Sequence, residues 1–206
     1  MLIAKKSFDD TIIRIRNIHE LYRYLINGLH FPEEAVADIL RSEIVYAVSA
    51  FDKFIHDIVK QGILEIFNSL RPATNTYHNF PICMEQMHSI LNPDPSSNAS
   101  AILEKIIITK HKFCAFQDPE KITPALSLIW QEDHKWQKIA SHLSVSEKDL
   151  KTELKNIVIR RNQIVHEGDL DAFTRSLQRI EELDVIRIVA FIEKLGDTIF
   201  TLVKLP

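Results

Sequence analysis

Glycine and cysteine are both rare in this chain, with four glycines and two cysteines in 206 residues. Long stretches without glycine or proline favour helices over a turn-rich β architecture. Cys83 and Cys114 are too few for a disulfide framework and lack the spacing of a metal site, so we expect reduced thiols in a cytoplasmic protein. The chain also lacks a run of 18 uncharged apolar residues. We therefore expect no membrane-spanning segment and no membrane partner.

Several common site signatures are missing as well. There is no glycine-rich phosphate loop, which excludes a P-loop nucleotide hydrolase. Nine histidines occur, but none forms the paired spacing of a zinc helix, so we expect no metal and no cofactor. The formal net charge of −3 argues against coating nucleic acid through bulk positive charge. It leaves room for a small site that binds one phosphate group.

Most of the chain shows apolar residues at the spacing of amphipathic helices. Apolar residues recur at helical spacing from the first residues onward, with Ser7 and Asp10 resembling a capping box. Pro32 fits the first turn of a second helix that can continue unbroken to about Leu70. Near the other end, Ser144 or Ser146 can cap a further helix. The sequence therefore predicts an all-α antiparallel bundle with long helices, in one domain spanning residues 1–206.

The middle of the chain, residues 72–143, is less regular and is predicted to be a helical insert. Prolines and a polar loop at residues 92–98 divide it. After it we expect the helix that begins at Ser144 or Ser146, a connection at residues 167–174, and a last helix. The remaining predicted helices cover residues 82–91, 99–113, 118–142 and 176–203.

A short polar motif closes the predicted helix before residue 168. Arg161 and His166 lie five residues apart, Asn162 lies between them, and Gly168 stops the helix. A guanidinium can bind a phosphate and an imidazole can exchange a proton near neutral pH, which are two requirements of metal-free RNA cleavage. Five helical steps place Arg161 and His166 about 140° apart, whereas Asn162 and His166 share a face. The alternative is that His166 only stabilises a helix C-terminus.

The long second helix carries a polar stripe. Arg41, Ser49, Asp52 and His56 follow one another at helical spacing on a helix otherwise rich in apolar residues. A solvated face would normally carry lysine and glutamate. Two interpretations remain open: the stripe lines a groove, or it forms an internal ladder in which Asp52 pairs with His56 and Arg41 pairs with a neighbouring acid.

These two motifs resemble those of a known family. The segment Arg161-Asn162-Gln163-Ile164-Val165-His166-Glu167 resembles the Arg-Asn-x3-His signature of the HEPN superfamily, and residues 41–56 resemble a second motif of its RiboL-PSP-HEPN-like prokaryotic group. The likeness spans residues 39–200. It implies an antiparallel helical bundle that pairs as a homodimer, with both Arg–His motifs in one cleft.

The resemblance also implies an activity, that of a metal-independent endoribonuclease in a toxin–antitoxin or phage-defence system. By position, Arg161 and His166 would be catalytic together with Asn162, with RNA as substrate and an antitoxin or other regulatory protein as a possible further partner. The products would carry 2′,3′-cyclic phosphate and 5′-hydroxyl ends. Asp52, Ser49, Arg41 and His56 would support the site.

Positive charge on the motif helix offers further contacts to RNA. We expect Arg160 and Lys155 to bind the RNA, although a solvated face of mixed charge is the alternative for the lysines. Two other functions stay open: a non-catalytic HEPN-like module that binds a partner protein or a nucleotide, and a helical scaffold in which the Arg–His pair is only a cap.

Overall fold

The computed structural model describes residues 1–171 and 173–204. Within these ranges the chain is helical and has no β-sheet, with one isolated bridge between Leu170 and Leu177. The predicted all-α class is confirmed. In chain order the helical elements are α1 (Leu2–Arg23), the π-helix η1 (Tyr24–Gly28), α2 (Glu33–Phe67), α3 (Asn75–His78), α4 (Met84–Leu91), α5 (Ala99–His111), α6 (Pro119–Ser127), α7 (Lys135–Leu143), α8 (Glu147–Glu167) and α9 (Glu182–Val203).

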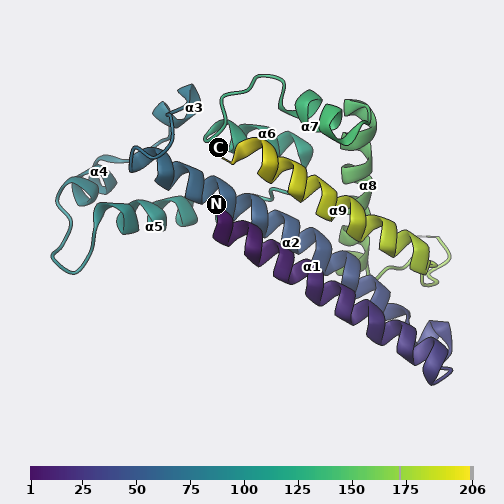
Figure 1. The fold of residues 1–206 in the computed structure, drawn as a ribbon. Coiled ribbons are helices and arrows are strands. Elements are labelled where there is room, and N and C mark those ends of the chain that lie inside the picture. Colours follow the sequence, from purple (N-terminus) through teal and green to yellow (C-terminus); the bar gives the residue numbers. More distant parts are fainter. Residues whose placement is uncertain (172, 205–206) are drawn as a thin grey trace.

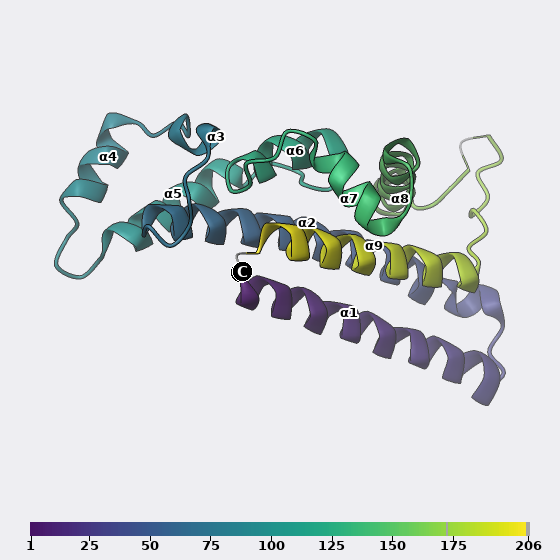
Figure 2. The ribbon, with the colours of Figure 1, turned by 45° about the horizontal axis from the view of Figure 1, so that its top comes forward.

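Three long helices form the body of the molecule. α1 and α2 run antiparallel, and α9 lies beside both, parallel to α2 (Figure 1). On the other face of α2, helices α6 to α8 form a second layer, in which α8 crosses the long helices steeply (Figure 2). Helices α3 to α5 gather at one end of α2, beyond the ends of α1 and α9.

The apolar stripes of the long helices explain this packing. In α1 the buried residues Ala4, Phe8, Ile12 and Ile15 recur at helical spacing, and all are at most 2% exposed. α2 is the central element, because it is buried on more than one side along its 35 residues. A Cβ atom at Gly196 of α9 would lie 2.6 Å from the Phe8 ring, so the close approach of α1 and α9 requires glycine there.

Two predicted boundaries near the ends of the long helices are wrong. The first helix begins at Leu2 instead of at the Ser7 cap, because the buried stripe already starts at Ala4. The last helix begins at Glu182 instead of residue 176. The backbone of Gln178 is engaged elsewhere: its N–H donates to the Asp169 carbonyl, and its carbonyl accepts from Arg41.

The single helix predicted over residues 118–142 is also wrong, because it is two helices, α6 and α7. Pro124 lies inside α6 without ending it. The break falls at residues 128–134, where Thr74 Oγ1 donates to the carbonyls of Ser127 and Leu128 and Arg71 donates to that of Ile129. Side chains from the α2–α3 connection therefore bind carbonyls that a continuous helix would use itself.

The predicted insert of residues 72–143 contains α3 to α7, and its division from the body stays a prediction. Its helix α5 packs against the far half of α2, where Lys60 and Glu104 form an ion pair at 2.9 Å. In the described part of the chain, no helix combines the length and the apolar character needed to cross a bilayer.

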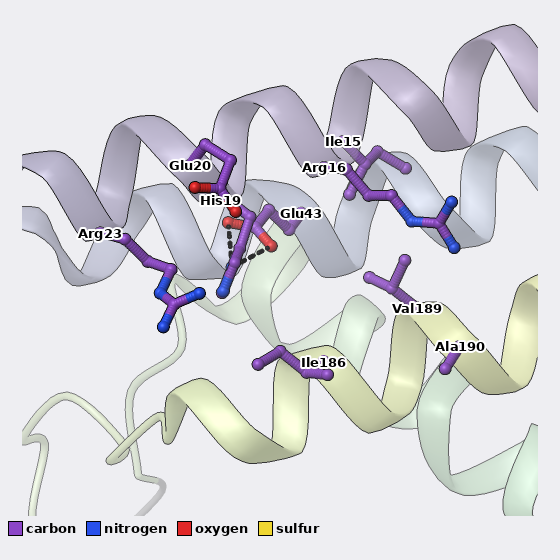
Figure 3. A pocket seen from close by; sticks show the side chains of 9 residues that line it. All are labelled: Ile15, Arg16, His19, Glu20, Arg23, Glu43, Ile186, Val189 and Ala190. Carbon is purple, nitrogen blue, oxygen red and sulfur yellow. Dashed lines mark hydrogen bonds and ion pairs between the residues drawn. The ribbon is translucent and has the colours of Figure 1, made fainter.

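A buried acid joins α1, α2 and α9. Glu43 of α2 accepts hydrogen bonds from His19 Nδ1 of α1 at 3.1 and 3.3 Å, and His19 Nε2 lies 3.2 Å from Glu182 Oε1 at the start of α9. His19 and Glu43 border a cavity of about 280 Å³ between α1 and α9 (Figure 3). Burial raises the pKa of Glu43 to about 7; the Glu182 charge also raises it, and His19 opposes both effects.

The raised pKa of Glu43 makes the stability of this junction depend on pH. The folded protein keeps the carboxyl protonated up to about pH 7, whereas an unperturbed carboxyl ionises near 4.5, so stability is lost as pH rises through this window. We expect Glu43→Gln to gain roughly 1–3 kcal/mol over the wild type across that window, measured by thermal unfolding at a series of pH values. Glu20→Gln, at an exposed carboxylate bordering the same cavity, is the control and should show no such pH dependence. A Glu43→Gln difference that is constant with pH would contradict the assignment.

Candidate functional site

The motif helix α8 is fixed at both ends by local signals. Ser146 is its N-cap, and its side chain accepts a hydrogen bond from the Asp149 N–H at 3.0 Å. Gly168 follows the last turn with φ of +64°, the left-handed conformation that ends helices. Leu150, Leu154 and Ile157 are buried along one side. This side therefore sets how the motif residues are oriented.

Arg161 lies on the buried side of α8. It follows Leu150 by eleven residues and Leu154 by seven, which places it within about 20° of both on an ideal helix. Its Nη1 donates to Asn162 Oδ1 at 2.9 Å, and its Nε is buried with no hydrogen-bond partner in the described part of the chain. Arg161 is thus half-buried and directed into the fold, with part of its donor capacity unused.

Asp52 of α2 faces this arginine. Burial raises the pKa of Asp52, and the charges of His56 and Arg161 and the Phe116 backbone amide oppose that rise. Asp52 Oδ2 lies 3.7 Å from His56 Nε2, and Nε2 also donates to the Cys114 carbonyl at 3.1 Å. The structure therefore brings Asp52, His56 and Arg161 into one cluster, with the Asp52–His56 contact of the ladder interpretation.

His166 and Ser49 are placed differently from that cluster. Both are exposed, Ser49 on α2 and His166 in the last turn of α8. A cavity of about 420 Å³ lies beside this last turn, between α2 and the α8 terminus; Ile164 and Gly168 line it, and His166 does not. Within one chain, Arg161 and His166 therefore point to different sides of α8, as their five-residue separation predicts.

Arg41 and Arg160 share a single buried carboxylate. Arg41 Nε donates to Asp169 Oδ2 at 2.5 Å, and Arg160 donates to both carboxylate oxygens, with Nη2 2.9 Å from Oδ2. Arg41 also contacts Asp38 Oδ1 at 3.1 Å and the Gln178 carbonyl at 2.7 Å. This is the ion pair of Arg41 with an acid that the ladder interpretation describes. The proposed RNA contact of Arg160 stays a prediction, and the structure gives its side chain a contact within the fold.

Lys155 remains accessible on α8. Its side chain is 51% exposed and its Nζ lies 3.7 Å from Glu120 Oε1 of α6. An ion pair at this distance on an exposed surface is weak, so Lys155 is available to another anion. In the described ranges no three His, Cys, Asp or Glu side chains are placed to hold a metal ion.

Asp169 and His111 are the residues of this region that sequence reasoning missed. Asp169 is 1% exposed and has φ of +58°, and only its position directly after Gly168 hinted at a role. His111 stacks edge-on against Phe116, 5.4 Å between ring centroids, and burial lowers its pKa, as do the charges of His56 and Lys110. Their full surroundings could not be foreseen, because Arg41 lies 128 residues before Asp169 and Phe80 lies on a different element from His111.

Comparison with known proteins gives one result. The family model described as RiboL-PSP-HEPN matches residues 9–205, nearly the whole chain. No curated protein and no solved structure matches the chain significantly. The resemblance suggested by the two motifs is therefore confirmed.

The Asp169 cluster leads to a prediction about stability. Asp169→Ala removes the buried anion shared by the buried Arg41 and the half-buried Arg160, and we expect a loss of about 3–5 kcal/mol in the free energy of unfolding, measured by urea denaturation. Asp38→Ala removes the exposed carboxylate that contacts the same Arg41 and should cost less than about 1 kcal/mol. Equal losses for the two variants would show that the buried carboxylate is not needed.

Proposed function

The chain belongs to the RiboL-PSP-HEPN family, and from this membership we propose that it is an endoribonuclease that needs no metal ion and acts through Arg161 and His166. The observation that carries the proposal is the pairing of a family match over residues 9–205 with Arg161, whose Nε is buried without a hydrogen-bond partner among the described residues and whose charge acts on Asp52. HEPN-type modules are commonly ribonucleases. A buried, underused guanidinium suits a group that must receive a phosphate.

In the proposed reaction the ribose 2′-oxygen attacks the adjacent phosphorus. His166 takes the proton from the 2′-hydroxyl or gives one to the departing 5′-oxygen, and the bond between phosphorus and that oxygen breaks. Arg161 stabilises the charge that builds up on the pentavalent phosphate. Asn162 hydrogen-bonds Arg161 at 2.9 Å and holds its orientation. The products are a 2′,3′-cyclic phosphate and a 5′-hydroxyl, so DNA is not a substrate.

Supporting roles follow from distance to this centre. Asp52 balances the charge of Arg161, and His56 lies 3.7 Å from Asp52. Ser49 lies three residues before Asp52 on α2 and is exposed, so it can contact RNA outside the Asp52 cluster. Arg41 supports the site from a greater distance, by fixing Asp169 and the end of α8.

We further propose that two copies of the chain complete the site. Arg161 is directed into the fold and His166 is exposed about 140° around the same helix, so one copy does not present both to a single phosphate. A twofold arrangement of two α8 termini would place an Arg161 and a His166 from different copies in one cleft. The exposed apolar residues Tyr46, Ile159 and Val165 near this face suit such an interface.

The setting proposed for this activity is a toxin–antitoxin or phage-defence system with a protein that restrains the nuclease. A second candidate is a non-catalytic module that binds a partner protein or a nucleotide. The observation in its favour is that Arg161 is half-buried and bonded to its neighbour Asn162. The next experiment separates the two.

The central prediction concerns His166. We expect the wild type to cleave labelled single-stranded RNA in EDTA and to leave cyclic phosphate ends, while His166→Ala loses at least about 100-fold in rate. The readout is gel analysis of the RNA with end-group determination. Because His166 is exposed, the variant should keep the circular dichroism spectrum and melting temperature of the wild type.

A matched control is His142→Ala, another exposed histidine in the last turn of a helix, in α7. It should cleave at the wild-type rate. Cleavage retained in His166→Ala would overturn the assignment of His166. RNA left uncut by the wild type while the folded protein still binds it would favour the non-catalytic module.

Mixing two inactive variants tests whether the site is shared between copies. In a mixed dimer of Arg161→Ala and His166→Ala, a site built from both copies is intact once, whereas sites built within one copy are both broken. We therefore expect the mixture, after unfolding and refolding together, to recover about a quarter of the wild-type cleavage rate, since about half of the dimers are mixed. Mixtures that stay as inactive as either variant alone would place Arg161 and His166 of one copy in the same site.

A further inference from the structure

The insert contains a cavity with a volume of about 610 Å³ between α3, α5 and α6. Its walls are mainly aromatic and aliphatic: Phe80 and Phe116 flank His111, with centroid distances of 6.0 and 5.4 Å. Burial lowers the pKa of His111, so its ring is mostly neutral at physiological pH. The wall is therefore a set of uncharged rings held in fixed edge-to-face positions.

The rim of this cavity is positively charged. Lys110 of α5 and Lys121 of α6 both line it. The neighbouring acid, Glu120, is exposed and only weakly paired with Lys155 of α8 at 3.7 Å, so Lys155 adds a third cation near the rim. Asn79 and Thr76 add an amide and a hydroxyl at the opening, and both are exposed. Aromatic walls, an amide and flanking cations are the chemistry that holds an unstacked nucleobase and its phosphates.

Polar side chains on α8 connect the rim of this cavity to the Arg161–His166 motif. Asn162 and His166 follow Lys155 by seven and eleven residues. All three therefore face the same side of α8 to within about 40°. At 1.5 Å per residue, Lys155 and His166 are about 16 Å apart along the helix, a distance that a few nucleotides of an extended strand cover. Lys155 contacts Glu120 at the cavity rim, so this stripe leads from the cavity to the motif.

We propose that the insert cavity binds one unpaired nucleobase of the RNA substrate, a few nucleotides from the phosphate that is cleaved, and thereby selects where the RNA is cut. This inference rests on the proposed ribonuclease function. It adds a specificity site made by residues of the insert, distinct from the Arg161–His166 centre. Lys121, Lys110 and Lys155 bind the flanking phosphates, and the rings of His111 and Phe80 contact the base.

The test fills the cavity from its opening. Thr76→Trp places a large ring at the mouth from an exposed position, so the fold is kept. His78→Trp, on the same helix α3 but outside the cavity lining, is the matched control. Both are made in the His166→Ala background, which prevents turnover, and the probes are fluorescein-labelled single-stranded RNA hexamers, intact or with one abasic ribose at each position in turn. Fluorescence anisotropy gives the Kd.

We expect Thr76→Trp to weaken binding of the intact hexamer roughly tenfold and His78→Trp to leave it unchanged. One abasic position should weaken binding to His166→Ala protein by a similar factor and should have no effect once Thr76→Trp is present. Equal Kd values for the two tryptophan variants, or hexamers that bind equally well whichever base is missing, would overturn the inference.

Cleavage by the wild type separates this inference from the proposed function. If the wild type cuts RNA while Thr76→Trp leaves both the Kd and the cut positions unchanged, the nuclease stands and the base pocket is wrong. If no RNA is cut but binding depends on one base and on Thr76, the cavity is a base-binding site and the catalytic proposal is wrong.

Discussion

A single buried carboxylate holds the functional end of the molecule together. Asp169 lies between the guanidinium groups of Arg41 and Arg160, so it joins α2, α8 and the connection to α9 at one point. Burying any one of these charges alone would be costly, and the three are tolerable only together. The last turn of α8 therefore has one position against α2. Arg161 is adjacent to Arg160, so its placement beside Asp52 follows from the same contact.

The side chains of α8 point to three different sides of the helix, and each side makes a different kind of contact. One side is buried and carries Arg161 towards Asp52; a second carries Arg160 to Asp169; a third is open to solvent and carries Lys155, Asn162 and His166. This division explains why a short motif can combine an arginine inside the fold with a histidine outside it. Under the proposed function it also agrees with the net charge of −3, since phosphate contacts would be needed only along one stripe and not over the whole surface.

The parts of the fold that local signals determine could be predicted from the sequence. Ser146 and Gly168 mark the ends of α8, and the apolar periodicity marks the long helices, because capping and amphipathicity act within a few residues. The break between α6 and α7 could not be predicted, since it depends on Thr74, more than fifty residues away. Asp169 was missed for the same reason: its partner Arg41 lies 128 residues earlier. Short motifs identified candidate site residues, whose roles stay predictions, whereas residues defined by distant contacts had no such signal.

The insert is attached at one end of a helix 35 residues long, which at 1.5 Å per residue extends about 50 Å. The carboxylate between the two arginines contacts α2 near its other end, at Arg41. Cys114 and Phe116, in the connection between α5 and α6, reach back to His56 and Asp52. Helices α3 and α4 lie at the far end, so changes in α3 and α4 leave the geometry around Arg161 in place. Under the proposed function, mutations in α3 and α4 would alter which RNA is recognised and would leave the contacts of Asp169 unchanged. Residues at the far end of α2 can therefore change without changing the contacts around Asp169, which lie near its start.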